Sequence, residues 1–576
     1  MLLVSCYNRH MTLIFDDDKQ KKNLADLQKQ EEEDLVQTLA EARYGIPPVH
    51  LSSMPIENDA LRLIDEKDAR AGEIAAFKLL GKDVHVALRS PQADNIANWT
   101  KFFTDREYIP HFYMASHTSL EKAWDRYKEI SYAEESRAGS MSISSAALKK
   151  LMANIKNIED IKKAVEDIEK DNTHTTSHIL EVALAGAVAI GASDIHFEPE
   201  ENTVRLRFRL DGILHEVMEI PPAAHKFINS RIKLISGLKI TANSIAQDGR
   251  FSIYLDQDEI SLRVSLIPGA YGESIVMRIL NPKSIRVKLE DMGVEPKLYE
   301  IFLKEIHKPN GLILLTGPTG SGKTTTLYSF LQKIYSTEIK IITIEDPIEY
   351  HLPGITQTQT DAEKGYTFLE GLRSALRQDP DVIMVGEIRD SETAKIAVES
   401  ALTGHLVFST LHTNNAAGVI PRLIDLDVNP KILVSALSLS IAQRLVRRLC
   451  VHCKKERTIK DNELELINKM IEKAKSYNKN FADYGVDLVN PFKLYESVGC
   501  LECNNTGFKG QIGIFEAIYN DAKIEDIIVK NPSEREIKEA ARNQVSLTIQ
   551  EDGLVKVLKG ITSYEEVAGV VDFYEE

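Results

Sequence analysis

The feature that most constrains the fold is a short apolar stretch that runs into a glycine-rich loop. Residues 311–316 read GLILLT and residues 317–324 read GPTGSGKT, which matches G-x4-G-K-[S/T] at every required position. Residues 325–335 then follow a helical pattern. Strand, loop and helix in this order are what a phosphate-binding loop requires, because its backbone N–H groups converge on phosphate oxygens at the start of the helix. The sequence therefore predicts a nucleotide site.

Two residues of this loop have specific predicted roles. Lys323 is expected to bridge the β- and γ-phosphates, and Thr324 is expected to ligate the Mg²⁺ that accompanies ATP. A glycine-rich turn that binds nothing is the alternative, and the strand–loop–helix context argues against it. The residues predicted to bind nucleotide here are Gly317, Pro318, Thr319, Gly320, Ser321, Gly322, Lys323, Thr324 and Thr325.

Carboxylates and histidines also lie next to short apolar stretches later in the chain. The carboxyl ends of parallel strands are where open α/β sheets bind ligands, and carboxylates there position water and metal ions. One such carboxylate alone is more often a helix cap, but several beside a phosphate-binding loop favour catalysis. The candidates are Glu345 after 341–344, Glu387 after 382–385, and His405 and His412 on either side of 406–411.

Together these segments resemble the Walker A, Asp box, Walker B and His box motifs of the type II/type IV secretion ATPase superfamily, over residues 170–576. The resemblance implies that Glu345 is the general base that polarises the attacking water and that Glu387 stands in the Walker B position. It also implies that His405 and His412 sense the γ-phosphate, with a structural role as the alternative for each. The family resemblance implies a hexamer docked at the cytoplasmic face of an inner-membrane machine.

Several arginines are candidates for stabilising the charge of phosphoryl transfer. Residues 262–280 resemble a segment of the family's second N-terminal domain, which implies that Arg263 and Arg278 reach nucleotide in the hexamer. Arg373 and Arg377 are four residues apart and are expected to share one helix face toward the same site. Other arginines alternate with apolar residues in 204–210, which predicts a solvated strand face: Arg205, Arg207 and Arg209.

Four of the five cysteines form two C-x2-C pairs. Such pairs are typical of a tetrahedral structural Zn²⁺ site, here with a long charged insert at 454–499. A redox dithiol and a metal-free remnant are the alternatives. Tetracysteine motifs occur in the pilus-assembly and type II secretion branches of the family, so the resemblance agrees. The predicted zinc ligands are Cys450, Cys453, Cys500 and Cys503.

Composition narrows the class of protein further. The chain has 576 residues, with 70 Lys and Arg against 86 Asp and Glu, and its net charge of −16 argues against a general duplex-DNA binder. Residues 1–15 lack the pattern of an export signal, and the longest apolar stretch, 182–192, is too short to span a membrane. We therefore expect a cytoplasmic protein that meets the membrane only through partners and binds no nucleic acid.

The predicted fold class is α/β, with a RecA-like phosphate-loop ATPase core preceded by a PAS-like α/β domain. The predicted divisions are an N-terminal docking domain (1–135), a linker (136–172), the second N-terminal, PAS-like domain (173–283), the RecA-like core (284–449) and a tetracysteine zinc motif with C-terminal helices (450–576). Residues 43–51 resemble the start of the family's docking domain, which binds a membrane-anchored partner and, in some members, cyclic di-GMP. No duplicated nucleotide-binding motif supports cyclic di-GMP here.

The predicted function is a homo-hexameric ATPase, peripheral at the cytoplasmic membrane, that powers pilin polymerisation in type IV pilus or type II secretion pseudopilus assembly. Its expected partners are an inner-membrane platform protein and a cytoplasmic or membrane-anchored docking protein. A DNA-translocating phosphate-loop motor and a non-hydrolysing nucleotide-binding scaffold are the alternatives. The sequence alone does not separate pilus assembly from secretion.

Overall fold

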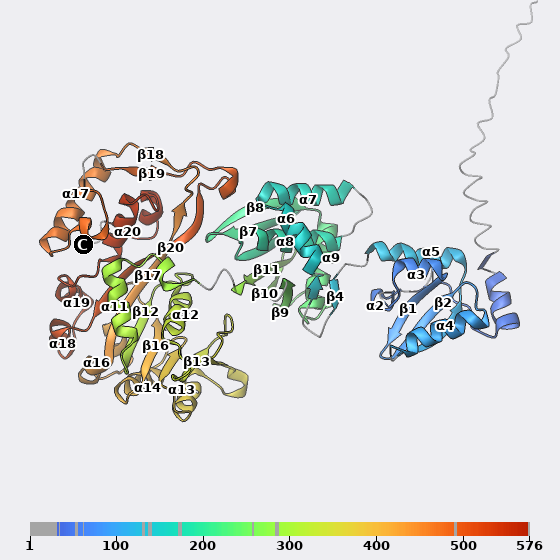
Figure 1. Ribbon diagram of the computed structural model, residues 1–576, viewed down its shortest axis with the longest axis horizontal. Helices are drawn as coiled ribbons and strands as arrows, with labels where there is room; N and C mark the ends of the chain where they lie inside the picture. Colours follow the sequence, from blue (N-terminus) through green and yellow to red (C-terminus); the bar gives the residue numbers. More distant parts are fainter. Residues whose placement is uncertain are drawn as a thin grey trace, which may run out of the picture. The chain divides into compact units, whose positions relative to one another are not determined.

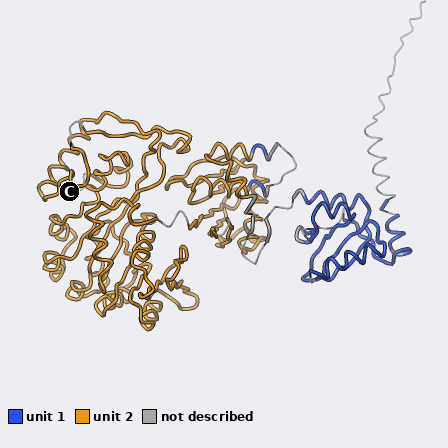
Figure 2. The backbone as a smooth tube through the Cα atoms, viewed as in Figure 1, with its two compact units in different colours: residues 1–132, 166–179 blue, residues 133–165, 180–576 orange. Residues whose placement is uncertain are grey.

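The computed structural model describes residues 32–573, except 34, 52, 53, 55, 62, 107, 130–132, 136–140, 144, 171–175, 256, 257, 283–286 and 489–491. The expectation that residues 1–15 carry no export signal lies outside this range. The chain divides into two compact units, one of residues 1–132 and 166–179 and one of residues 133–165 and 180–576 (Figure 2). No helix among the described residues is long and apolar enough to cross a membrane.

The first unit contains a three-stranded sheet in the order β1-β2-β3. Strands β1 and β2 are antiparallel, and β2 and β3 are parallel. The indole Nε1 of Trp124 donates to the carbonyl oxygen of Ile74, which fixes a helix against the sheet. The elements are η1 (Ala40–Tyr44), α2 (Asn58–Leu61), α3 (Glu66–Ala71), β1 (Ile74–Leu80), β2 (Asp83–Leu88), α4 (Ala93–Thr104), β3 (Ile109–Met114), α5 (His117–Asp125) and η2 (Arg126–Glu129).

Short strands and three helices follow along the chain. The interval predicted as a linker, 136–172, holds helices α6 and α7 in its described part. Helix α8 contains most of the apolar stretch 182–192. These elements are β4 (Ala133–Glu135), β5 (Met141–Ile143), α6 (Ser145–Asn154), α7 (Ile158–Lys170) and α8 (Thr176–Ala189).

The second unit contains a six-stranded antiparallel sheet in the order β8-β7-β6-β11-β10-β9. In β7 the apolar residues alternate with arginines, and Val204 and Phe208 are buried as the period of two predicts. The arginines pair with carboxylates instead: Arg205 with Glu200, Arg207 with Glu198 and Arg209 with Asp194. The elements are β6 (Asp194–Pro199), β7 (Val204–Leu210), β8 (Ile213–Ile220), α9 (Pro222–Ile235), β9 (Gln247–Leu255), β10 (Asp258–Gly269) and β11 (Gly272–Leu280).

A seven-stranded sheet in the order β14-β13-β15-β16-β12-β17-β20 forms the centre of the part of the chain that follows β11 (Figure 1). Its first six strands are parallel, as the alternation of strands and helices predicts. All of β12 is buried: Leu312 and Leu314 contribute to one core, and Ile313 and Leu315 to another. The elements are η3 (Leu289–Asp291), α11 (Pro296–Ile306), β12 (Gly311–Thr316), α12 (Lys323–Ile334), β13 (Ile341–Glu345), β14 (Thr356–Gln359), η4 (Ala362–Lys364), α13 (Phe368–Leu376), β15 (Val382–Val385), α14 (Ser391–Leu402), β16 (Leu406–Leu411), α15 (Val419–Asp425), α16 (Pro430–Ala436) and β17 (Leu437–Leu449).

The seventh strand, β20 (Phe508–Tyr519), lies just where the sequence predicts that helices run to the end of the chain. It pairs antiparallel with β17 and carries six buried apolar side chains, so tertiary pairing explains this strand. The elements around it are β18 (Lys455–Arg457), α17 (Asp461–Ser476), η5 (Phe481–Tyr484), β19 (Leu494–Glu496), η6 (Leu501–Cys503), α18 (Ala522–Ile528), α19 (Glu534–Ala541), α20 (Ile549–Leu558) and α21 (Tyr564–Ala568).

Candidate functional site

The phosphate-binding loop connects β12 to α12 at the carboxyl edge of the parallel strands. Gly322 caps α12 with φ of 85°, and a Cβ there would lie 2.8 Å from Nε2 of Gln443, so only glycine fits. Ser321 is 4% exposed, and among the described residues its Oγ has no hydrogen-bond partner. A buried hydroxyl left unpaired inside such a loop is the group that a bound phosphate would satisfy. The loop therefore fits the phosphates of a nucleotide.

Lys323 is the first residue of α12, and its Nζ donates to the carbonyl oxygens of Gly317 (2.8 Å) and Pro318 (3.2 Å). The pKa of its ammonium is lowered, because burial outweighs the opposite effect of the Glu387 carboxylate. The ammonium thus lies inside the loop, close to a carboxylate. Thr324 and Thr325 follow in the first turn of the helix.

Glu387 and His412 come from the ends of two adjacent parallel strands, β15 and β16. His412 Nε2 lies 3.2 Å from Glu387 Oε2, and Arg389 forms an ion pair with the other carboxylate oxygen. Burial raises the pKa of Glu387, but Arg389 and His412 together hold it below its usual range. Glu387 is therefore a carboxylate in its charged form that contacts an imidazole, and it is near enough to Lys323 to influence the pKa of that ammonium.

Glu345, at the end of β13, is only 2% exposed. Its carboxylate accepts hydrogen bonds from the hydroxyls of Tyr328 and Thr343 and from Nε2 of Gln357 (3.1 Å). Burial raises its pKa despite these donors. In this conformation the carboxylate predicted to polarise water is surrounded by protein donors.

The two histidines predicted to sense the γ-phosphate lie at opposite ends of β16. His405 precedes the strand, its Nδ1 is 3.0 Å from the carbonyl oxygen of Ser400, and its own carbonyl accepts from the N–H of Gly311, where β12 begins. His412 follows the strand, on the edge where the phosphate-binding loop lies. The structure brings His412, and not His405, to the loop of the same chain.

The four arginines predicted to stabilise the transferring phosphate lie on different elements and have different partners. Arg263, on β10, donates to the carbonyl oxygen of Ile348 (2.8 Å) and pairs with Glu349 (3.3 Å), only a few residues after Glu345. Arg278, on β11, is 62% exposed and pairs with Asp194. Arg373 lies on α13 and binds Glu370 and Glu392, whereas Arg377 caps the end of α13 and binds Ser374.

Several residues that the sequence did not single out lie beside the phosphate-binding loop. Gln443, on β17, accepts a hydrogen bond from Thr326 (2.8 Å) through Oε1. The Oγ1 of Thr316, the last residue of β12, bonds to the backbone and the hydroxyl of Thr413, next to His412. Arg444 also lies here. The only sequence signal for these residues is the polar pair Gln443 and Arg444, which stands between apolar residues in β17.

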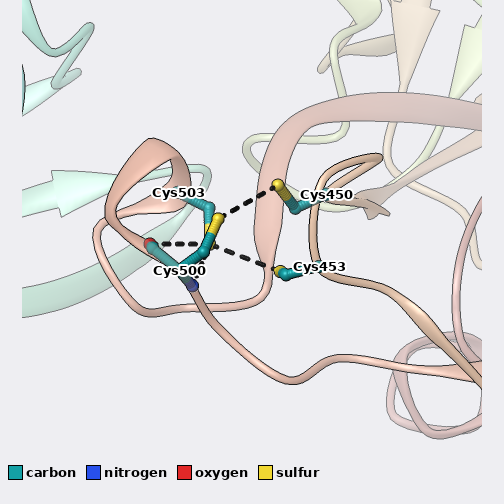
Figure 3. Close-up of side chains that lie close together, drawn as sticks. All are labelled: Cys450, Cys453, Cys500 and Cys503. Carbon is teal, nitrogen blue, oxygen red and sulfur yellow. Dashed lines mark hydrogen bonds between the residues drawn. The ribbon is translucent and has the colours of Figure 1, made fainter.

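The four cysteines of the two C-x2-C pairs converge from two turns, one after β17 and one before β20 (Figure 3). All four sulfur atoms lie within 4.8 Å of one another. Cys450 Sγ is 3.9 Å from Cys500 Sγ, and Cys453 Sγ is 3.8 Å from Cys503 Sγ. Backbone N–H groups of Cys500 and Gly507 donate to Cys503 Sγ, as they do to thiolate ligands. The cluster could hold a metal ion.

The chain is similar to several known proteins. Residues 169–569 match the protein family described as Type II/IV secretion system protein. The chain is 35% identical over 532 residues to the type IV pilus assembly ATPase PilB of Myxococcus xanthus, over 92% of this chain and 89% of that protein. It is 42% identical over 406 residues to type II secretion system protein E of Pseudomonas aeruginosa, over 70% of this chain and 77% of that protein. A solved structure of the Legionella pneumophila ATPase DotB is 22% identical, covers 68% of this chain and 94% of its own, and gives a TM-score of 0.48.

Proposed function

The chain belongs to the Type II/IV secretion system protein family, and on that premise we propose that it is an ATPase that powers the assembly of a type IV pilus or of a type II secretion pseudopilus. The observation that carries the proposal is the convergence of Lys323, Glu387 and His412 at one edge of the parallel sheet. A cation for the phosphates and a carboxylate for the metal ion are groups that phosphoryl transfer uses, and the imidazole contacts that carboxylate.

The roles follow from the contacts. Loop N–H groups, the Ser321 hydroxyl and Lys323 would bind the phosphates, with Lys323 exchanging two carbonyl partners for phosphate oxygens. Thr324 would hold Mg²⁺, which would supply positive charge to offset the negative charge that develops during transfer. Glu387 would hold the metal ion and its water, and His412, in contact with Glu387, would respond to the γ-phosphate.

Glu345 would act as general base only after a change of partners. Its oxygens now accept from Tyr328, Thr343 and Gln357, so a water molecule could reach it once one of these donors withdraws. Binding of nucleotide between the core and the preceding domain is a candidate trigger, because Arg263 of that domain contacts the segment just after Glu345.

We further propose that the working form is a hexamer in which Arg263 and Arg278 stabilise the transferring phosphate. The 62% exposure of Arg278 leaves it accessible to a neighbouring copy. The hexamer would dock on an inner-membrane platform protein at the cytoplasmic face of the membrane, and residues 1–135 would bind a docking partner of the same machine.

Replacing Arg263 with Ala is expected to lower ATP turnover about 100-fold, because one donor to developing charge is lost. Arg278→Ala is also expected to lower ATP turnover, but only in the assembled hexamer. Both variants are expected to stay folded. Steady-state phosphate release at matched oligomer concentration measures this, with Arg205→Ala as the control, since Arg205 is an outward arginine of the same sheet paired with Glu200. Wild-type rates per hexamer in both variants would reject the arginine proposal.

The function itself is tested by phosphate release from ATP with and without Mg²⁺, together with light scattering of the nucleotide-bound protein. We expect Mg²⁺-dependent turnover and a species of six chains. Nucleotide binding without phosphate release would instead indicate a scaffold, and strong stimulation of turnover by DNA would indicate a DNA-translocating motor.

The cysteine cluster is proposed to hold a structural Zn²⁺. Four thiolates at a Zn–S distance of about 2.3 Å form a tetrahedron with edges of about 3.8 Å. The sulfur pairs Cys450–Cys500, Cys453–Cys503 and Cys500–Cys503 are separated by 3.9, 3.8 and 3.7 Å, which matches that edge. The ion would join the two turns that enclose the insert at 454–499.

A further inference from the structure

Arg444 lies beside the phosphate-binding loop, although it is far from the loop in sequence. Strand β17 runs parallel to β12, with Thr316 opposite Ala442, and it continues past the end of β12. Arg444 is therefore carried beyond the last residue of β12. A Cβ on Gly317, the first residue of the loop, would lie 3.1 Å from Arg444 Nη1. The guanidinium thus packs against the base of the loop.

The guanidinium connects β17 to the segment that follows β16, and these are the two strands that flank β12. Its Nη1 donates to the carbonyl oxygen of Gln443 (3.0 Å) on β17, and its Nη2 donates to the carbonyl oxygen of Asn414 (2.5 Å), three residues after β16. Arg444 is partly buried, yet among the described residues it forms no ion pair. Glu516 forms no ion pair with Arg444 but is near enough to raise the pKa of the guanidinium, against the larger lowering effect of burial. A partly buried guanidinium that binds only carbonyls acts as a brace between backbone segments.

The segment that Arg444 holds is the one that follows His412. Thr413 is bonded to Thr316 at the end of β12, and the N–H of Ala416 donates to Glu516 on β20 (3.0 Å). Between these two anchors, Asn414 borders a cavity of about 420 Å³ that Arg444 and Glu516 also line. The Thr413 hydroxyl also donates to the carbonyl oxygen of Asn415 (3.0 Å). The hydrogen bond from Arg444 to the carbonyl oxygen of Asn414 adds a contact that ties this segment to β17.

We propose that Arg444 is a positioning residue of the ATPase site, which braces residues 412–416 against the phosphate-binding loop so that His412 keeps its contact with Glu387. The inference rests on the proposed function, because it assigns Arg444 an effect that acts through His412. The planar guanidinium binds two carbonyls at once from fixed directions, whereas a lysine ammonium on a flexible chain offers a point charge without that geometry. The brace depends on shape as well as on charge.

The test compares Arg444→Gln and Arg444→Lys with Arg448→Gln. Arg448 is an exposed arginine on the same strand and serves as the matched control. We expect both Arg444 variants to lower kcat about 100-fold, since a misplacement of about 1 Å in a catalytic group has that effect. Binding of a fluorescent ATP analogue should change less than threefold, because the loop and Lys323 remain. Thermal unfolding shows whether each variant is folded.

A double-mutant cycle with His412→Ala separates this role from a purely structural one. If Arg444 acts through His412, Arg444→Gln should add little to the loss that His412→Ala already causes. Additive losses, or wild-type kcat in both Arg444 variants, would overturn the inference. Restoration of activity by Arg444→Lys would also overturn it, because charge alone would then suffice. If the wild-type protein releases no phosphate, the proposed ATPase function is wrong. If the wild type is active and the His412→Ala variant is defective, the Arg444 variants test the role of Arg444 alone.

Discussion

Replacing Glu387 with Gln is expected to reduce ATP turnover about 1000-fold, while ATP binding remains close to that of the wild type. The substitution keeps the size of the side chain and removes its negative charge. That charge lies beside Lys323 and His412, and Arg389 and His412 hold its pKa below the usual range, so it is present at neutral pH. A neutral amide would neither hold the Mg²⁺ firmly nor orient the attacking water. Single-turnover phosphate release and equilibrium binding of a fluorescent ATP analogue measure the two quantities separately.

Glu392→Gln is the matched control, because Glu392 is an exposed carboxylate on α14 that pairs only with Arg373 among the described residues. Glu345→Gln makes an informative comparison. If Glu345 leaves its buried hydrogen bonds to act as general base, that variant should also lose turnover while retaining ATP. Full turnover in Glu387→Gln would contradict the assignment of Glu387, whatever Glu345 does.

The parts of the site that the sequence predicts are those set by local motifs and by the alternation of strands and helices. The phosphate-binding loop and the parallel sheet follow from a local motif and from hydrophobic patterning, and the convergence of Lys323 with Glu387 follows from the rule that parallel strands end at one edge. The cysteine spacing likewise predicts a cluster, and the structure brings all four sulfurs together.

The remaining features depend on register and burial, which a single sequence does not reveal. His405 and His412 flank the same six-residue strand, but only the structure shows that this strand separates them to opposite edges of the sheet. Glu345 follows an apolar strand just as an exposed catalytic carboxylate would, yet a tyrosine from α12 and a glutamine from β14 enclose it.

Arg444 shows why distant contacts are hardest to predict. It is more than 120 residues from the loop in sequence, and it reaches the loop because β17 pairs with β12 in one particular register. A shift of one residue would turn its side chain to the other face of the sheet. Strand β20 was predicted as helix for a related reason, since it exists as a strand through its pairing with β17.

Replacing Cys503 with Ser is expected to abolish zinc binding and to unfold the region between the two cysteine pairs. Metal binding to structural sites of this kind contributes on the order of 10 kcal/mol to folding in isolated zinc-finger peptides. The loss here should stay local, because β17 and β20 pair over most of their length without the metal. Zinc content should fall from about one equivalent per chain to less than about half. Hydrogen exchange should quicken in residues 450–507 and remain slow in β12.

Cys6→Ser provides the control for this experiment, because Cys6 is the cysteine outside the two pairs. Cys500→Ser should reproduce the effect of Cys503→Ser, since each contributes one sulfur to the same tetrahedron. Two outcomes would reject the zinc proposal: wild-type protein that carries less than about half an equivalent of zinc, or a Cys503→Ser variant that retains the metal. If zinc is lost while hydrogen exchange in residues 450–507 stays unchanged, the ion binds at the cluster without holding the two turns together. Hydrogen bonds would then hold the turns instead, such as the one from the N–H of Cys450 to the carbonyl oxygen of Gly507 (2.9 Å).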